Sequence, residues 1–216
     1  MSKGSRNFTV IDPWNVEGKQ LYFLLNSIVV PRPIAWISTL SSDGVFNLAP
    51  HSYTTVLSPN PPIVCFVSVG EKDTLRNVQA VGDFVYNLAG EDLLESVNLS
   101  AADFPPDQSE FDWTGLSPVP SDLVKSPRLR EVSISMEAIL AGTQRIRDTA
   151  NVLVMGEVIR IHVADEVITD GRVDPEKLRP VGRLSGSLYS AQGEIISLKR
   201  PTYKGLLDSG AAPRRR

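Results

Sequence analysis

Several side chains that form hydrogen bonds lie close together in the stretch PRPIAWISTLSSDGVFNLAPHSYTT, residues 31–55. They are Ser38, Thr39, Asn47, His51 and Ser52. Apolar residues separate them, as is typical of strands rather than of a loop. An isolated polar residue in a strand usually faces water, but several on paired strands can converge on one planar ligand with polar edges. The stretch therefore predicts a site that hydrogen-bonds a heterocycle.

The segment GEKDTLRN, residues 70–77, carries the residue types that bind an anion. A helix that begins at Asp73 or Thr74 presents free backbone N–H groups and the positive end of its dipole. Lys72 and Arg76 add positive charge, and Thr74 adds a hydroxyl. The segment thus resembles a phosphate-binding site without a P-loop. The alternative is that Asp73 or Thr74 only caps the helix while Lys72 and Arg76 are solvated.

Period-two alternation predicts the strands that position these groups. Residues 34–40 alternate in this way, and the turn SSDG at 41–44 returns the chain through residues 45–57. Further strands are predicted at 63–69, 83–89, 132–140 and 151–163. Gly156 is predicted to form a bulge or kink in the last of them.

Short helices are predicted at four places. They fall within 14–30, where Leu21, Leu24 and Leu25 form an apolar side, and at 72–82, 91–101 and 174–178. The proline-rich, acidic segment 102–122 has no periodicity and is predicted to be an ordered excursion that packs on the domain. Because no helices alternate regularly with the strands, the pattern favours a mainly β antiparallel barrel over a doubly wound parallel sheet.

The chain has 216 residues, of which 42% are hydrophobic and 22% charged. This predicts a single domain over residues 1–216 with a core at about 20–200. No stretch approaches the roughly 20 apolar residues that cross a bilayer, so no membrane contact is expected. The net charge of −3 gives no general attraction to nucleic acid. The tail Arg214-Arg215-Arg216 is interpreted as a solvated terminus.

The sequence excludes several classes of enzyme. It has no G-x-G-x-x-G after a strand, no P-loop and no G-x-S-x-G, and one Cys with two His residues cannot form a Cys-rich zinc site. His162 is predicted to be a paired or strand-edge histidine rather than a metal ligand. Cys65 is predicted to be a buried, unreactive thiol. A lone cysteine and a start without an apolar signal core predict a cytoplasmic protein.

Several segments, taken in order, carry a family resemblance. They are PRPIAWISTLSSDGVFNLAPHSYTTVLSPNPP, KDTLRN, GDFVYNL, SAADFPP, GLSPVPS and LRPVGRLSGSLYS. Together they resemble the flavin reductase-like FMN-binding split-barrel family of cytoplasmic flavoproteins, over roughly residues 20–200. The resemblance implies a Greek-key split β-barrel that holds FMN noncovalently near a homodimer interface, with NADH or NADPH as reductant.

The resemblance also implies site residues. The WIST and NLAPHS segments would contact the flavin through Trp36, Ser38, Thr39, Asn47, Ala49, His51 and Ser52. Lys72 and Thr74 would hold the phosphate, with Arg76 or Asn77 assisting. The later segments would approach the flavin face or the partner subunit through Asp103, Phe104, Ser187 and Tyr189. The family often has an aromatic residue where His51 stands, so His51 either packs beside the ring or donates a hydrogen bond to it.

In the activity that the resemblance implies, hydride passes from the nicotinamide C4 to the flavin N5. That step requires stacking and exclusion of water rather than a protein nucleophile, so no catalytic residue and no metal are predicted. The expected partners are a second copy of the chain and a monooxygenase or other electron acceptor. Reduced flavin is either released or retained, and NADH and NADPH are not distinguished.

Two alternatives stay open at this point, because a fold that binds flavin need not bind nicotinamide productively. The first is a non-catalytic FMN-binding or electron-carrier protein. The second is a flavin-free barrel that binds another small ligand.

Overall fold

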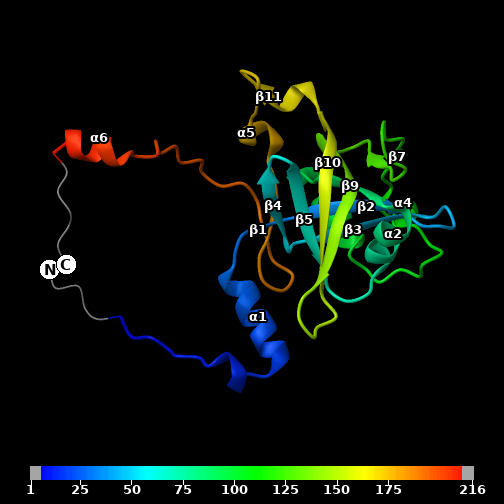
Figure 1. The fold of residues 1–216 in the computed structure, drawn as a ribbon, viewed down its shortest axis with the longest axis horizontal. Coiled ribbons are helices and arrows are strands. Elements are labelled where there is room, and N and C mark those ends of the chain that lie inside the picture. Colours follow the sequence, from blue (N-terminus) through cyan, green and yellow to red (C-terminus); the bar gives the residue numbers. More distant parts are fainter. Residues whose placement is uncertain (1–5, 211–216) are drawn as a thin grey trace.

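The computed structural model describes residues 6–210, so the predicted solvated tail Arg214-Arg215-Arg216 lies outside the described residues. Within that part of the chain, seven strands form one antiparallel sheet in the order β3-β2-β6-β9-β10-β5-β4 (Figure 1). They are β2 Ala35–Leu40, β3 Phe46–His51, β4 Thr54–Pro59, β5 Pro62–Ser68, β6 Asp83–Leu88, β9 Ile134–Arg145 and β10 Val152–Val163. This architecture confirms the predicted mainly β antiparallel fold.

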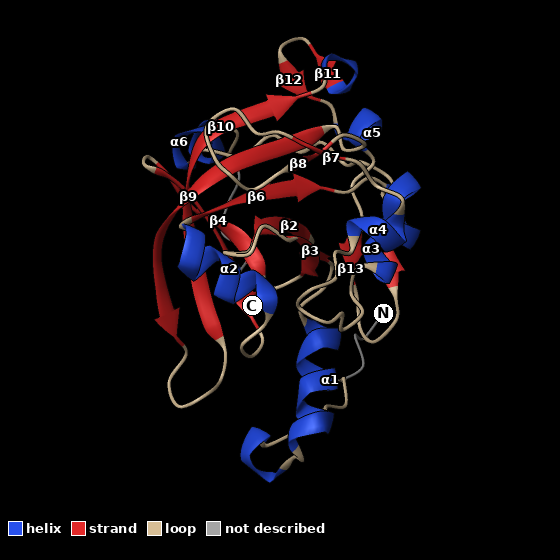
Figure 2. Ribbon diagram, turned by 90° about the vertical axis from the view of Figure 1, so that its right-hand side faces the viewer, coloured by secondary structure: helices blue, strands red, loops and turns tan. Residues whose placement is uncertain are grey.

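The remaining elements are short, and most of them lie around the sheet (Figure 2). The helices are α1 Gly18–Ile28, α2 Asp73–Val81, α3 Leu94–Leu99, α4 Phe111–Thr114, α5 Pro175–Leu178 and α6 Tyr203–Asp208, with 3-10 turns η1 Pro13–Asn15, η2 Glu91–Leu93 and η3 Asp165–Val167. Two-residue strands pair as β1 Arg32–Pro33 with β13 Gly182–Arg183, β13 with β14 Tyr189–Ser190, β7 Pro118–Val119 with β8 Arg128–Leu129, and β11 Ile168–Thr169 with β12 Arg172–Val173. The four predicted helical regions are confirmed, with boundaries that differ by a few residues.

Residues 45–57 return the chain after the turn, as predicted, but they belong to two strands, β3 and β4. β3 pairs with β2, whereas β4 pairs with β5. The chain bends between them at Ser52 and Tyr53. The Tyr53 hydroxyl and the Asn26 side chain of α1 exchange hydrogen bonds of 2.9 and 3.1 Å, which hold the bend. The break depends on this tertiary contact, so alternation along the sequence does not reveal it.

Both faces of the sheet are buried at β2. On one face Ile37 packs in a core with Leu75 and Val78 of α2. On the other face Trp36 packs in a second core that includes Val97 of α3 and Phe111 of α4. Because helices cover both faces, the alternation of β2 identifies a strand but does not tell which side faces a ligand.

The sheet curls until β3 lies against β5, as a barrel requires. The His51 and Phe66 rings are 4.6 Å apart, and His51 Nδ1 lies 3.4 Å from the Val67 carbonyl oxygen. In β10 the pairing with β9 shifts register at Gly156. A Cβ atom on Gly156 would lie 2.3 Å from Cζ of Phe84, so no larger residue fits there without rearrangement. The predicted bulge at Gly156 is confirmed.

The segment 102–122 packs on the sheet as predicted. Phe111 and Leu116 are buried in the core beneath α3. Cys65 is also buried, as predicted, and its burial raises the pKa of its thiol.

Residues 6–17 and 191–210 extend away from the sheet on the side where α1 projects (Figure 1). Large apolar side chains on these segments face solvent, among them Trp14 at 93% and Leu198 at 87% exposed. Within residues 6–210, no helix has both the length and the apolar run that a bilayer crossing would need.

Candidate functional site

A cavity of about 270 Å³ lies where β3, the start of β4, the start of α2 and residues 100–104 meet. Its volume is close to the lower end of the range for ligand pockets, about 300 to 1,000 Å³. Eight residues selected from the sequence line it: Asn47, Ala49, His51, Ser52, Lys72, Thr74, Asp103 and Phe104. We call this the first cavity. The fold therefore brings the NLAPHS and KDT segments, and the first residues of the excursion, to one place.

The start of α2 forms one end of the first cavity. Lys72 is the N-cap residue and its side chain makes no capping hydrogen bond. Asp73 instead pairs with Arg76, and the Thr74 hydroxyl is buried and donates to Asn47 Oδ1 at 3.0 Å. The alternative that Asp73 or Thr74 caps the helix is therefore wrong. The first N–H groups of an α-helix have no intrahelical acceptor, so this end of α2 offers donors beside Lys72.

A buried chain of hydrogen bonds supports this end of the cavity. The Asn47 side chain donates from Nδ2 to Glu110 Oε1 at 2.6 Å, and its Oδ1 accepts from Thr74 and, at 3.3 Å, from Thr39. Asn77 donates to the Thr39 hydroxyl at 3.0 Å. These contacts join β2, β3, α2 and the excursion. Thr39 and Asn77 therefore support the cavity wall rather than line it.

Glu110 is a cavity residue that sequence reasoning missed. It is only 4% exposed, lines the first cavity, and accepts through Oε2 from the Leu48 N–H at 2.8 Å. Burial raises the pKa of the Glu110 carboxyl, although the hydrogen bonds from Leu48 and Asn47 oppose the shift. No local pattern marks Glu110, because it lies in an aperiodic segment and its partners are more than 60 residues away in sequence.

An ion pair crosses the mouth of the first cavity. Lys72 Nζ donates to Asp103 Oδ1 at 2.6 Å, and both side chains are largely exposed. The hydrogen bond and charge of Lys72 lower the pKa of the Asp103 carboxyl. The adjoining Phe104 ring lies 5.9 Å from the Trp113 ring. The excursion thus places both a carboxylate and an aromatic ring beside the start of α2.

His51 is neutral and lacks one hydrogen-bond partner. Burial lowers its pKa to about 4, against a weaker opposing contact with the Val67 carbonyl. Because a carbonyl oxygen only accepts, this contact places the ring proton on Nδ1 and makes Nε2 an acceptor. Nε2 is buried and has no partner among residues 6–210. In this tautomer His51 can accept, but not donate, a hydrogen bond at Nε2.

Several other predicted residues do not line the first cavity. Trp36 Nε1 donates to the Ser100 hydroxyl at 2.9 Å, and the Ser38 hydroxyl donates to the Pro127 carbonyl at 2.5 Å. Both side chains are fully buried. Arg76 and Asn77 line a separate hollow beside the 41–44 turn. Cofactor contact by these residues stays a prediction.

A second cavity, of about 390 Å³, adjoins the first. The two share lining residues Tyr22, Pro50, Ser52 and Ala101. Tyr189 lines the second cavity, whereas the predicted residue Ser187 is exposed on the preceding loop and lines neither.

A cluster of titratable side chains lies apart from both cavities. His162 Nε2 is 2.7 Å from Glu137 Oε1, which confirms the prediction of a paired histidine. Burial alone would raise the pKa of Glu137, but N–H groups of Asp122 and Leu123 and the His162 ring together lower it. Asp122, Glu137 and His162 come within metal-ligand distance of one another. The N–H groups of Asp122 and Leu123 already occupy both Glu137 oxygens. The cluster therefore joins the loop at 122–123 to strand β9.

A protein-family model for the flavin reductase like domain matches residues 27–177. The chain belongs to this family. The match runs from the end of α1 into α5 and includes every lining residue of the first cavity except Tyr22. A relative from Halalkalibacterium halodurans, described only as an uncharacterized protein, is 41% identical over 203 residues, which cover 89% of this chain and 96% of that protein.

Two solved structures extend the comparison. Component B of nitrilotriacetate monooxygenase from Bacillus cereus is 34% identical, with a TM-score of 0.85 over 90% of this chain and 100% of that chain. The 2-nitrobenzoate 2-nitroreductase of Pseudomonas fluorescens is 30% identical, with a TM-score of 0.84 over 90% and 98%. The structure also matches a solved structure of a protein with a split barrel domain, so the fold is a split barrel, as predicted.

Proposed function

We propose that the first cavity holds FMN noncovalently and that the protein is an NADH- or NADPH-dependent flavin oxidoreductase. This proposal is supported by one observation, namely that a single cavity combines an anion-binding end with a wall that suits a flat ring. Lys72 and the free N–H groups at the start of α2, including that of Thr74, form a phosphate-binding end, and β3 supplies a wall of mixed polar and apolar character from Asn47 to His51.

The cavity residues suit FMN in three respects. Lys72 and the α2 N–H groups offer the charge-assisted donors that a phosphate requires. Ala49, Pro50 and Ala101 provide small apolar surfaces against which a flat ring can lie. The unpartnered Nε2 of His51 is an acceptor for a ring N–H. Three carboxylates also line the cavity, and Asp73, Asp103 and Glu110 are each engaged by a cation or by N–H donors.

When bound, FMN supplies hydride acceptance at N5, with NADH or NADPH as the proposed donor. The contribution of the protein is orientation and exclusion of water. The excursion closes one side through Phe104, and the Asn47 network fixes the position of α2. No side chain of the cavity is assigned as a nucleophile or general acid.

A non-catalytic FMN carrier is the rival, and one experiment separates the two. Purified protein loaded with FMN is titrated with NADH and, separately, with NADPH without oxygen. Rapid loss of the visible absorbance band of oxidised flavin supports the oxidoreductase. Full retention of the band with both nucleotides contradicts the enzyme assignment and supports the carrier.

The electron acceptor belongs to the same proposal. One solved relative is a component of a monooxygenase and another is a nitroreductase, so a separate monooxygenase and a small bound acceptor are both reasonable for this chain. A reduced flavin that leaves the protein during gel filtration would favour release to a partner enzyme. The lone Cys65 agrees with a cytoplasmic location for this chemistry.

A homodimer is the proposed assembly. Exposed apolar side chains follow α1 and both extended terminal segments, including Ile28 at 64%, Trp14 at 93% and Leu198 at 87%. So many exposed large apolar side chains are uncommon on a monomer, and a second copy of the chain would cover them. Sedimentation equilibrium of the FMN-loaded protein should give twice the chain mass, and a monomer with FMN fully bound would contradict the assembly.

A further inference from the structure

The second cavity is continuous with the first and differs from it in charge. Ser52 and Ala101 lie on the shared wall. Beyond them the second cavity is lined by Arg32 and Arg183, and no Asp or Glu is among its lining residues within 6–210. By contrast, Asp73, Asp103 and Glu110 line the first cavity. The chain as a whole carries a net charge of −3, so this positive cavity is a local feature.

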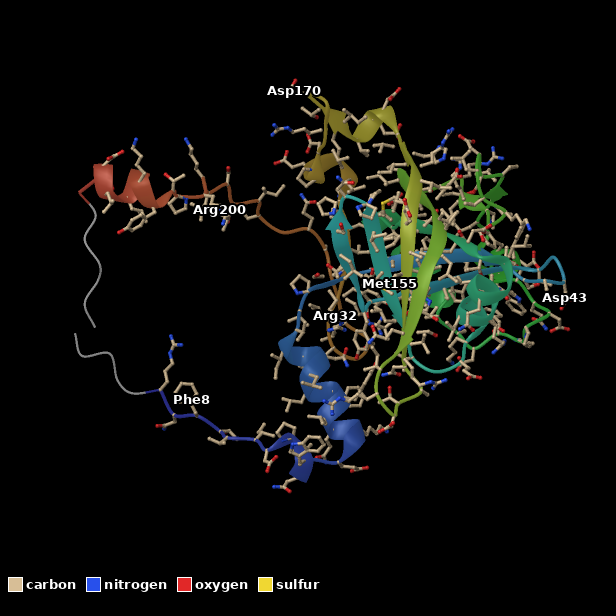
Figure 3. All side chains as sticks on the ribbon, viewed as in Figure 1. Phe8, Arg32, Asp43, Met155, Asp170 and Arg200 are labelled. Carbon is tan, nitrogen blue, oxygen red and sulfur yellow. The ribbon has the colours of Figure 1, made fainter. Side chains whose placement is uncertain are left out.

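Arg32 is a buried cation without a carboxylate partner. It is only 7% exposed and is located where α1 joins the sheet (Figure 3). Its guanidinium donates to the carbonyls of Asn26, Val29 and Leu184, at 2.7 to 2.8 Å, and to the Ser52 hydroxyl at 3.4 Å. These neutral acceptors satisfy its hydrogen bonds but leave its charge uncompensated. Buried charges are normally paired, so an unpaired one favours an anion nearby.

Arg183 is the second cation and is better placed to contact a ligand. Its guanidinium lies 4.3 Å from the centroid of the Tyr189 ring, which fixes its position, and one nitrogen donates to the Gly186 carbonyl. Most of its N–H groups are free of partners in the described structure. Within residues 6–210, no carboxylate oxygen lies within 4 Å of Arg32 or Arg183.

Aromatic side chains complete the walls of this cavity. Tyr22 and Phe23 of α1 lie on one side and Tyr189 on another. Aromatic walls favour a flat ring, and a guanidinium matches the two oxygens of a carboxylate or phosphate. The volume of about 390 Å³ suits one ring with an anionic group.

We propose that the second cavity, through Arg183 with Arg32 behind it, binds the anionic group of a flat-ring compound that exchanges electrons with the flavin. This inference rests on the proposed flavin site in the adjoining cavity. Two kinds of compound have the required flat ring and anionic group. One is a nicotinamide dinucleotide, which would bind through its phosphates, and the other is an aromatic carboxylate that acts as electron acceptor.

The test measures binding of three probes, NAD⁺, NADP⁺ and benzoate, to the FMN-loaded protein by calorimetry. In the Arg183→Gln variant we expect at least one probe to bind about tenfold or more weakly, as loss of a charge-assisted contact predicts. Arg183→Lys should lie between that variant and the wild type, since lysine keeps the charge without the planar fork. The matched control is Arg172→Gln, which removes the same charge from the exposed strand β12 and should leave all affinities within about twofold.

The probes whose affinity falls in the Arg183→Gln variant identify the class of ligand. Weakening of NAD⁺ or NADP⁺ alone assigns the cavity to the nucleotide, and weakening of benzoate alone assigns it to an aromatic acid. If wild-type protein binds none of the probes, or if Arg183→Gln binds them all as tightly as the wild type, the proposal is overturned.

A separate FMN titration distinguishes this inference from the proposed function. We expect Arg183→Gln to bind FMN as the wild type does and, since it loses only the contacts with Tyr189 and Gly186, to unfold within about 4 °C of it. Parallel loss of FMN and probe affinity would contradict a separate anion site. If the wild-type chain does not bind FMN but binds a probe through Arg183, the flavin proposal fails and the anion site remains.

Discussion

Asn47 Nδ2 lies 2.6 Å from Glu110 Oε1, and this hydrogen bond joins the first hairpin to a segment 63 residues later in the chain. The other Glu110 oxygen accepts from the Leu48 N–H. One buried carboxylate therefore fixes the excursion against β3 at the edge of the first cavity.

Glu110→Gln should destabilise the protein. The amide can replace only one of the two acceptor oxygens, and its NH₂ group would face a donor. We expect the free energy of unfolding to fall by about 1 to 3 kcal/mol, measured by urea denaturation. Glu95→Gln, on the exposed surface of α3, is the control and should change little. Equal free energies of unfolding for the Glu110→Gln variant and the wild type would show that this contact does not stabilise the fold.

Lys72→Ala tests the phosphate end of the cavity. It should weaken FMN by roughly 10- to 100-fold while changing riboflavin binding little, because only FMN carries a phosphate. Fluorescence titration with both ligands provides the comparison. Lys125→Ala, which removes an exposed lysine elsewhere, is the control. Similar weakening of FMN and riboflavin would place the phosphate somewhere else.

Asp103→Asn should have the opposite effect. The variant frees Lys72 from its ion pair and removes a negative charge from the cavity mouth. Since the pair is exposed, we expect FMN to bind only about two- to fivefold more tightly, with riboflavin unchanged. The gain should shrink at high salt. Weaker FMN binding in this variant would mean that Asp103 contacts the cofactor favourably.

His51 should make stability depend on pH. Its folded-state pKa is about 4, below the ordinary value of 6.5, so between these values the unfolded chain takes up a proton that the folded chain does not. Stability is therefore lost as the pH falls through this window, by up to about 3 kcal/mol. Urea denaturation of His51→Phe across the window should show a shallower pH dependence than the wild type. Parallel stability curves would contradict a neutral, buried His51.

The sequence pattern predicts much of this fold because, in most elements, local conformational preference and tertiary packing favour the same structure. β2 alternates as a strand, and α2 ends at Gly82, whose φ of +85° is the left-handed conformation that glycine adopts readily. The break at Ser52 and Tyr53 is different, because it depends on the contact between Tyr53 and Asn26 of α1. No pattern within residues 45–57 encodes that partner.

The site is less predictable than the fold for a related reason. Ser38 and Thr39 are neighbours in the sequence but point to opposite faces of β2, and both faces are buried. Choosing the face that meets a ligand requires knowledge of what covers each side. Glu110 is harder still to predict, because its role comes only from hydrogen bonds that it accepts from residues far away in the sequence. The start of α2 at the KDT segment can be predicted because a helix start gathers its N–H donors locally, whereas contact of this segment with a phosphate stays a prediction.

We propose that the first cavity binds one FMN per chain. Equilibrium dialysis of the purified protein against FMN, read by the visible absorbance of the retained flavin, measures this directly. We expect a yellow protein that holds one FMN per chain and retains it more tightly than riboflavin. A colourless protein that takes up no FMN would contradict it.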